Sequence, residues 1–124
     1  MNGVLWVIQG LLAVAFLLAG GMKTLQPIEA LGKVMDWVRA VPPGVVRFIG
    51  AAEALGAIGL ILPMLTGILP GLTVAAAIGL ALVMALATAF HLSRGESSRV
   101  PGNAVLLLLA LSVVIGRLAI APVA

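Results

Sequence analysis

The sequence has no cysteine, a single histidine and few charged residues. Without cysteine the chain has no disulfide bond, no thiolate metal ligand and no thiol redox chemistry. The single histidine, His91, has no neighbouring set of ligand-type residues, so we expect no metal site. Residues 67–71 carry glycines but are apolar and have no lysine, which excludes a phosphate-binding loop. No nucleophilic triad is recognisable either.

Apolar residues make up most of the chain. They account for 63% of the 124 residues, only 9% are charged, and the mean hydropathy is +1.29. A soluble domain of this length has too little interior to bury so much apolar surface. The net charge of +3 does not indicate nucleic-acid binding, because the basic residues lie at the edges of the apolar runs rather than in an aromatic-interleaved stripe. We therefore expect the lipid bilayer, and no nucleic acid, as a partner.

The apolar residues fall into four runs, each long enough to cross a bilayer, which takes about 20 residues of helix. Backbone polar groups in hydrocarbon must be satisfied within the segment, and the runs are continuous rather than alternating, so helices are expected. Short connections place neighbouring helices antiparallel. The sequence thus predicts an all-α integral membrane four-helix bundle, as one transmembrane domain over residues 1–124, with spans at about 3–21, 45–64, 69–90 and 103–121.

The connection between the first two spans has an amphipathic pattern. Pro27 suits the first turn of a helix and Pro42 with Pro43 ends one, which predicts a helix over about 27–40. This pattern suits a helix lying in the membrane surface, with Trp37 anchored at headgroup level and Trp6 doing the same at the opposite face. The alternative, compatible with the first, is that the helix packs on the bundle. Its apolar face would consist of Ile28, Leu31, Met35 and Val38, opposite Glu29, Lys33 and Asp36.

Basic residues predict the orientation, because they favour the cytoplasmic side of short loops. Of the seven, all but Arg117 belong to the side of the two longer loops, and the 65–68 turn on the other side has no charge. We expect the protein in the bacterial inner membrane, with both termini outside the cytoplasm.

The third span is rich in small residues at four-residue spacing. Such stripes allow helices to approach closely in membranes. We expect them to serve packing within the bundle, and a homodimer face is the alternative. One stripe is Gly71, Ala75 and Gly79; the other is Ala77, Ala81, Ala85 and Ala89.

Glu53 is the most informative polar residue, because it lies near the middle of the second span. A central acid costs about 2.5–3.5 kcal/mol on insertion scales and normally faces the bundle interior with a partner. It is either a structural polar group or part of a ligand- or proton-handling site. Matching depths along antiparallel spans places it level with about residue 12, and gives Ser112 as a candidate hydrogen-bond partner. Gln9 and Arg117 lie further toward the non-cytoplasmic face, where Arg117 either reaches inward or extends to the interface.

A second group of polar residues lies at the cytoplasmic edge: Lys23, Arg47, His91 and Asn103. Asn103 is suited to cap the fourth helix, and His91 ends the third. We expect His91 to act as an interfacial cap rather than as a ligand.

Four segments form a pattern along the chain: LAGGMK at 18–23, RFIGAAEALGAIGLILP at 47–63, FHL at 90–92 and the Gly116–Arg117 end of the last span. Together they resemble the DoxX-like membrane proteins over essentially the whole chain. The resemblance implies four transmembrane helices and carries over Lys23, Glu53 and His91 as matching positions without an assigned chemistry. The family name comes from subunits of quinone-linked sulfur oxidation, some relatives belong to membrane oxidoreductase complexes, and eukaryotic relatives assist assembly or export of other proteins.

Three functions follow as hypotheses. The first is a non-catalytic accessory, assembly or lipid-binding component of a membrane complex, with another membrane protein or a second copy as partner. The second is a quinone-linked oxidoreductase subunit in which Glu53 or His91 binds the quinone; no other cofactor is evident. The third is a small transporter or proton pathway formed by an oligomer, which four helices without broken-helix repeats make the least favoured. We do not expect an enzyme acting alone, because the chain has no catalytic constellation.

Overall fold

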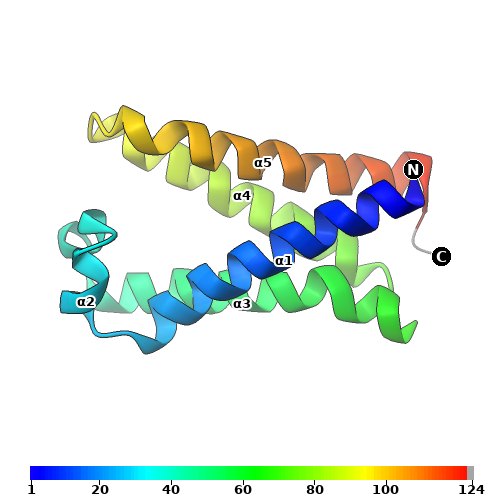
Figure 1. Ribbon diagram of the computed structural model, residues 1–124, viewed down its shortest axis with the longest axis horizontal. Helices are drawn as coiled ribbons and strands as arrows, with labels where there is room; N and C mark the ends of the chain where they lie inside the picture. The colour runs from blue at the N-terminus through cyan, green and yellow to red at the C-terminus, as the bar shows by residue number, and fades with distance from the viewer. Residues whose placement is uncertain (123–124) are drawn as a thin grey trace.

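The computed structural model describes residues 1–122, and within that range it contains helices and turns but no strand (Figure 1). Four helices are long and apolar enough to cross a membrane, which confirms the predicted fold class. They are α1 (Asn2–Leu25), α3 (Pro43–Thr66), α4 (Leu72–Ser93) and α5 (Val100–Ile115), the last prolonged by the π-helical η3 (Gly116–Ile120). Three shorter pieces connect them: α2 (Ile28–Gly32) and the 3-10 helices η1 (Asp36–Ala40) and η2 (Ser97–Arg99).

Proline and glycine set the helix ends. α1 ends just before Gln26, whose extended backbone is the conformation favoured before Pro27. Pro43 is the first residue of α3, where a missing N–H is not needed. Gly67 follows α3 with φ of 73°, a left-handed conformation that glycine adopts without strain. These residues produce the same breaks that the sequence predicts.

The four long helices form two pairs that part at one end. α1 lies against α3 at its C-terminal end and crosses toward α5 at its N-terminal end (Figure 1). α1 and α3 approach each other closely at Gly20, where a Cβ atom would lie 2.5 Å from the Gly50 carbonyl oxygen and 2.7 Å from the Ala54 nitrogen. At the terminal end, Leu5 of α1 packs against Gly116. The pair α4–α5 therefore diverges from α1–α3 at the end that carries the longer loops, called here the loop end.

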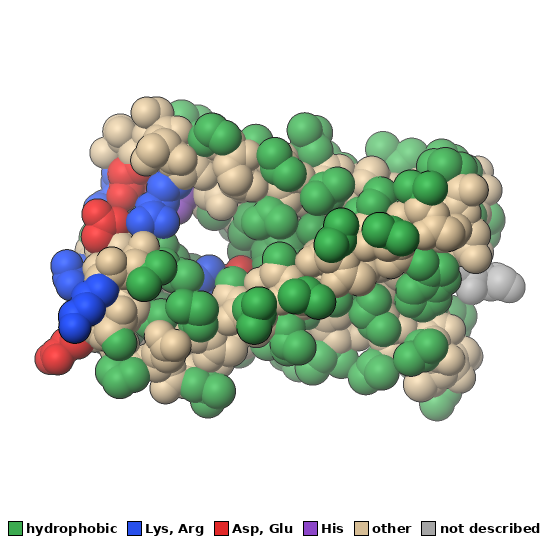
Figure 2. Space-filling model, in the orientation of Figure 1, with side chains coloured by type: hydrophobic (Ala, Val, Ile, Leu, Met, Phe, Trp, Pro, Cys, Tyr) green, Lys and Arg blue, Asp and Glu red, His purple; other side chains and the backbone are tan. Residues whose placement is uncertain are grey.

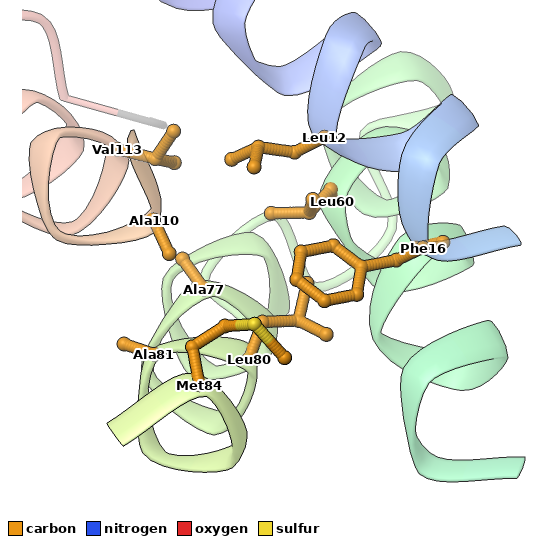
Figure 3. Packing of buried hydrophobic residues seen from close by; sticks show 10 residues of the cluster. Leu12, Phe16, Leu60, Ala77, Leu80, Ala81, Met84, Ala110 and Val113 are labelled. Atoms are coloured by element: carbon orange, nitrogen blue, oxygen red, sulfur yellow. The ribbon is translucent and has the colours of Figure 1, made fainter. Parts of the chain in front are cut away.

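The core occupies the middle of the bundle and draws on all four long helices. Figure 3 shows the Phe16 ring of α1 and the Met84 side chain of α4 pointing toward one another. Leu12 and Leu60 lie above them, beside Val113 of α5. These side chains close the space between the diverging pairs on the inner side of the loop end.

The outer surface of the bundle is apolar, and at most 33% of the most apolar stretch of any span is buried inside the protein. The small-residue stripes of α4 divide between the two surfaces. In one stripe, Ala77 and Ala81 are buried in the core, as expected for packing within the bundle, whereas Ala85 and Ala89 are exposed. Gly71, Ala75 and Gly79 face outward, so that stripe does not pack within the bundle.

The segment between the first two spans differs from the single helix predicted over about 27–40. It forms α2 and η1, separated by a bend at residues 33–35, and each piece is five residues long. Leu31 and Val38 are buried against the bundle, in agreement with the packing alternative. Trp37 is buried too, so the expectation that it anchors at headgroup level is wrong. The indole packs against the rings of Phe90 and His91, which bury more of its apolar surface than an exposed position would.

The N-terminus and residue 122, the last that the structure describes, lie at the end opposite the loop end (Figure 1). Charged side chains gather at the loop end, whereas the visible face of the terminal end has none (Figure 2). The charge asymmetry used to predict the orientation is thus a property of the folded bundle. The compartment that each end faces stays a prediction.

Candidate functional site

A cavity of about 630 Å³ lies at the loop end, where the two helix pairs diverge. Its volume is in the range of small-molecule sites, about 300–1,000 Å³. The lining is mostly apolar, with a few polar groups, and Figure 2 shows the hollow behind the charged loop end. The polar and charged lining residues are Lys23, Glu53, His91, Ser98, Arg99 and Asn103.

A buried ion pair forms the inner polar wall of the cavity. The Lys23 Nζ atom donates to Glu53 Oε1 over 2.5 Å, and the side chains are only 10% and 2% exposed. Each charge compensates the other in surroundings where a single charge would be very costly. The Lys23 ammonium also lies 5.5 Å from the centroid of the Trp37 ring, within cation–π range. Lys23 and Glu53, assigned to separate groups in the sequence, thus form one unit.

The predicted partners of Glu53 do not reach it. Ser112, the favoured candidate, donates to the Leu109 carbonyl oxygen of its own helix over 2.7 Å. The depth matching that suggested it is wrong because the close approach at Gly20, rather than the midpoints of the spans, sets the register of α1 on α3. Leu12, expected level with Glu53, lies deeper in the core. Lys23 stands one turn beyond Gly20, and its long side chain covers the remaining distance to the carboxylate.

Gln9 and Arg117 form a separate polar cluster at the terminal end. Arg117 is 1% exposed and neither extends to the interface nor approaches Glu53. Its Nε donates to Gln9 Oε1 over 2.8 Å, and its Nη1 donates to Asn2 Oδ1 and to the Ala121 carbonyl oxygen. Gln9 in turn donates to the Leu60 carbonyl oxygen over 2.6 Å. The cluster links α5, α1 and α3, so we interpret it as a structural lock.

Arg47, predicted in the same edge cluster as Lys23, acts at the end of α1. Its Nη1 donates to the carbonyl oxygens of Lys23 and Gln26 over 2.8 and 2.6 Å. These carbonyls belong to the helix end, where the acceptors lack intrahelical donors and the helix dipole favours a cation. Arg47 does not line the cavity but fixes the backbone that carries Lys23.

His91 and Trp37 form the outer wall of the cavity. The His91 ring packs edge-on against Trp37 with 6.1 Å between centroids, and its Nδ1 lies 3.0 Å from Glu96 Oε1. Arg94 donates to the same carboxylate oxygen over 2.7 Å. The His91 contact, followed by the Arg94 contact, holds the pKa of Glu96 below its usual value. His91 is therefore held by the α4–α5 loop, and its ring faces the cavity.

Asn103 does not cap the fourth helix as predicted. α5 begins after Arg99, and no side chain caps it. The Nδ2 group of Asn103 is buried and finds no hydrogen-bond partner among the described residues, although the side chain lines the cavity. An unpaired buried donor is costly. A group bound in the cavity would satisfy it.

The cavity reaches the outer surface between the two helix pairs, both on the side of α1 and α5, where Figure 2 shows the hollow, and on the side of α3 and α4. Phe48 of α3 and Leu86 of α4 line it and are also 73% and 63% exposed on the outer surface. Both belong to spanning helices, so this opening faces hydrocarbon. Toward the loop end, Trp37 and a contact of 3.3 Å between Arg99 and Asp36 lie over the cavity.

Sequence reasoning missed the role of the aromatic residues. Trp37, Phe48 and Phe90 all line the cavity, yet each has an ordinary explanation in an apolar chain. The adjacency of Phe90 to His91 was the available signal.

Residues 1–122 hold no cluster of three ligand-type side chains for a metal ion.

Comparisons with known proteins identify a family but no individual relative. No curated protein and no solved structure matches the chain. The model of the DoxX-like family matches residues 7–113, as the resemblance of the second span predicts. Since this match covers most of the 124 residues, the chain belongs to the DoxX-like family of membrane proteins.

Proposed function

We propose that this protein is a non-catalytic membrane component that binds a lipid-soluble molecule in the loop-end cavity. The observation that carries the proposal is an apolar cavity of about 630 Å³ with a buried ion pair in its wall. Binding sites for small molecules typically combine an apolar lining with a few placed polar groups. The exposed lining residues Phe48 and Leu86 connect the cavity with the lipid-facing surface, which offers a direct route from the bilayer.

The polar groups favour binding over catalysis. Lys23 and Glu53 neutralise each other, so neither is free to act as a general acid or base. His91 is engaged by Glu96 on one ring nitrogen. Asn103 offers a donor but no reactive group. These residues are suited to hold and orient a molecule.

Native mass spectrometry of the protein released from membranes tests the proposal. Ala52 lines the cavity, whereas the adjacent Ala51 is exposed on the outside of the same helix. Ala52→Phe places a ring inside the cavity and narrows it, and Ala51→Phe adds the same side chain on the lipid side. We expect a bound small molecule on the wild type and on Ala51→Phe that is lost from Ala52→Phe. Equal occupancy of the two variants would contradict binding in this cavity.

A quinone-linked oxidoreductase subunit is the second candidate. The aromatic side chains of Trp37, Phe48 and Phe90 in the lining suit a flat ring, and Lys23 and Asn103 supply donors for its oxygens. Electrons would come from a partner subunit, since the chain has no redox-active side chain set of its own. A short-chain benzoquinone should then raise the melting temperature of the wild type and not of Ala52→Phe. No shift in either protein would eliminate this candidate.

We propose that the loop end faces the cytoplasm of a bacterial inner membrane. The distribution of basic residues supports this orientation, because all except Arg117 belong to the loop-end half of the bundle. Reporter tags at the termini measure it directly. Tags that are active only in the cytoplasm would reverse the orientation.

A further inference from the structure

We infer that the cavity selects a lipid-soluble molecule with an uncharged head that accepts hydrogen bonds, such as a ketone or an ester, and that this molecule arrives sideways from the bilayer. This inference rests on the proposed function and specifies the chemistry of its ligand. It starts from the balance of charge and of hydrogen-bond donors around the cavity.

The charge balance excludes an ionic head. At the inner wall, the Lys23 ammonium and the Glu53 carboxylate lie 2.5 Å apart and cancel. At the rim, Arg99 is matched by Asp36. An added charge in the inner part of the cavity would find no free counter-charge. The free energy of removing that charge from water would therefore not be offset by a new ion pair. A neutral head leaves the existing pairs intact.

The donor balance favours an accepting head. Asn103 Nδ2 is a buried donor without a partner among the described residues. The Lys23 ammonium has three protons, and one of them is donated to Glu53. The Glu53 carboxylate already accepts from Lys23. A carbonyl or ester oxygen in the cavity would accept a hydrogen bond from a donor that the protein leaves unused.

The apolar surroundings determine how the rest of the molecule lies. Phe16 and Met84 form the closed inner floor, where Figure 3 shows them facing each other. Phe48 and Leu86 border the opening toward lipid. Trp37 covers the opposite, loop-end side. An apolar chain attached to the head would therefore extend sideways, between the two helix pairs, into the bilayer.

Trp37 is a built-in reporter for this inference. The chain has two tryptophans, and Trp6 lies at the terminal end, 5.6 Å from Arg117. Trp6→Phe therefore leaves Trp37, at the cavity, as the single fluorophore. The probes share one decyl chain with a bromine near the head, where a bound probe brings it close to Trp37 and quenches the indole fluorescence, and they differ only in the head: a methyl ketone, a carboxylate or a trimethylammonium group. Each is added to the Trp6→Phe protein in nanodiscs.

We expect the ketone to quench Trp37 at a concentration at least about tenfold below that of either charged probe. Asn103→Leu should weaken the ketone by roughly three- to tenfold, the effect of one lost hydrogen bond. Glu53→Gln leaves Lys23 uncompensated and should shift the preference to the carboxylate. If Glu53→Gln does not fold, as judged by circular dichroism and gel filtration, Asn103→Leu still provides the test.

The outcomes separate the inference from the proposed function. Ala52→Phe, with Ala51→Phe as its matched control, reports whether quenching depends on the cavity. If no probe distinguishes these two variants, the proposed function is wrong. If quenching depends on the cavity but the charged probes act at the same concentration as the ketone, the inference is wrong and the proposed function stands.

Discussion

The ion pair between Lys23 and Glu53 leads to a quantitative prediction about stability. Both side chains are almost completely buried, at 10% and 2% exposure, and they meet at 2.5 Å. Glu53→Gln removes one charge and leaves the other without compensation. Removing one partner of a buried pair typically costs about 3–5 kcal/mol. Lys23→Met keeps the length of the side chain and should cost a similar amount.

The double variant Lys23→Met with Glu53→Gln should be less destabilised than either single variant, because no charge remains buried. Replacing both partners of such a pair is often neutral or stabilising. A neutral hydrogen bond between membrane helices would give a different result, since such bonds average about 0.6 kcal/mol and their loss would be small in every variant. The burial of both charges decides in favour of the larger effect.

The free energy of unfolding measured in mixed micelles, with SDS as the denaturant and circular dichroism as the readout, tests this prediction. Lys33→Met is the control, because Lys33 is exposed and should change stability by less than about 0.5 kcal/mol. The reasoning would be refuted if the double variant lost as much stability as the two single variants together. Additive losses would mean that the two side chains do not compensate each other.

Three further predictions concern the packing and the two ends of the bundle. Gly20→Ala should lower the free energy of unfolding by about 1–3 kcal/mol, because its Cβ meets backbone atoms of α3. Gly21→Ala has open space around its Cβ and should be neutral or stabilising in the same assay. Arg117→Met should cost about 1–3 kcal/mol through its unpaired partners, clearly less than Glu53→Gln, and an equal loss would point to an acidic partner. The pKa of Glu96 is lowered, so its contact with His91 is kept above the ordinary glutamate pKa and is lost as the pH falls through the lowered value. Hydrogen exchange in the α4–α5 loop should therefore rise as the pH falls through that value. Glu96→Gln should remove this pH dependence.

Much of the fold follows from composition and spacing. Four apolar runs, interrupted at Pro27, Pro43 and Gly67, predict four spanning helices because hydrocarbon leaves the backbone no other partners. The residues of the second span also carry the family resemblance that the family match confirms. The secondary structure of the segment between the first two spans does not follow from the sequence, because its amphipathic pattern fits one helix as well as it fits α2 and η1.

The partner of Glu53 could not be predicted in the same way. Its burial and its need for a partner follow from an acid in the middle of an apolar run. Which residue pairs with it depends on the register of α1 on α3, and that register is set by the contact of Gly20 with Gly50 and Ala54. A displacement of a single turn would bring a different side chain to the carboxylate.

By itself, the sequence determined that this protein spans a membrane with four helices, that its charges gather at one end, and that Glu53 is buried. These properties depend on how each segment partitions between water and lipid, which is local in the chain. Only the tertiary structure decided that Glu53 meets Lys23, that Trp37 and His91 close the same cavity, and that Arg117 belongs to the other end. Those contacts depend on how helices distant in sequence cross and diverge, and close packing at a few small residues decides that geometry.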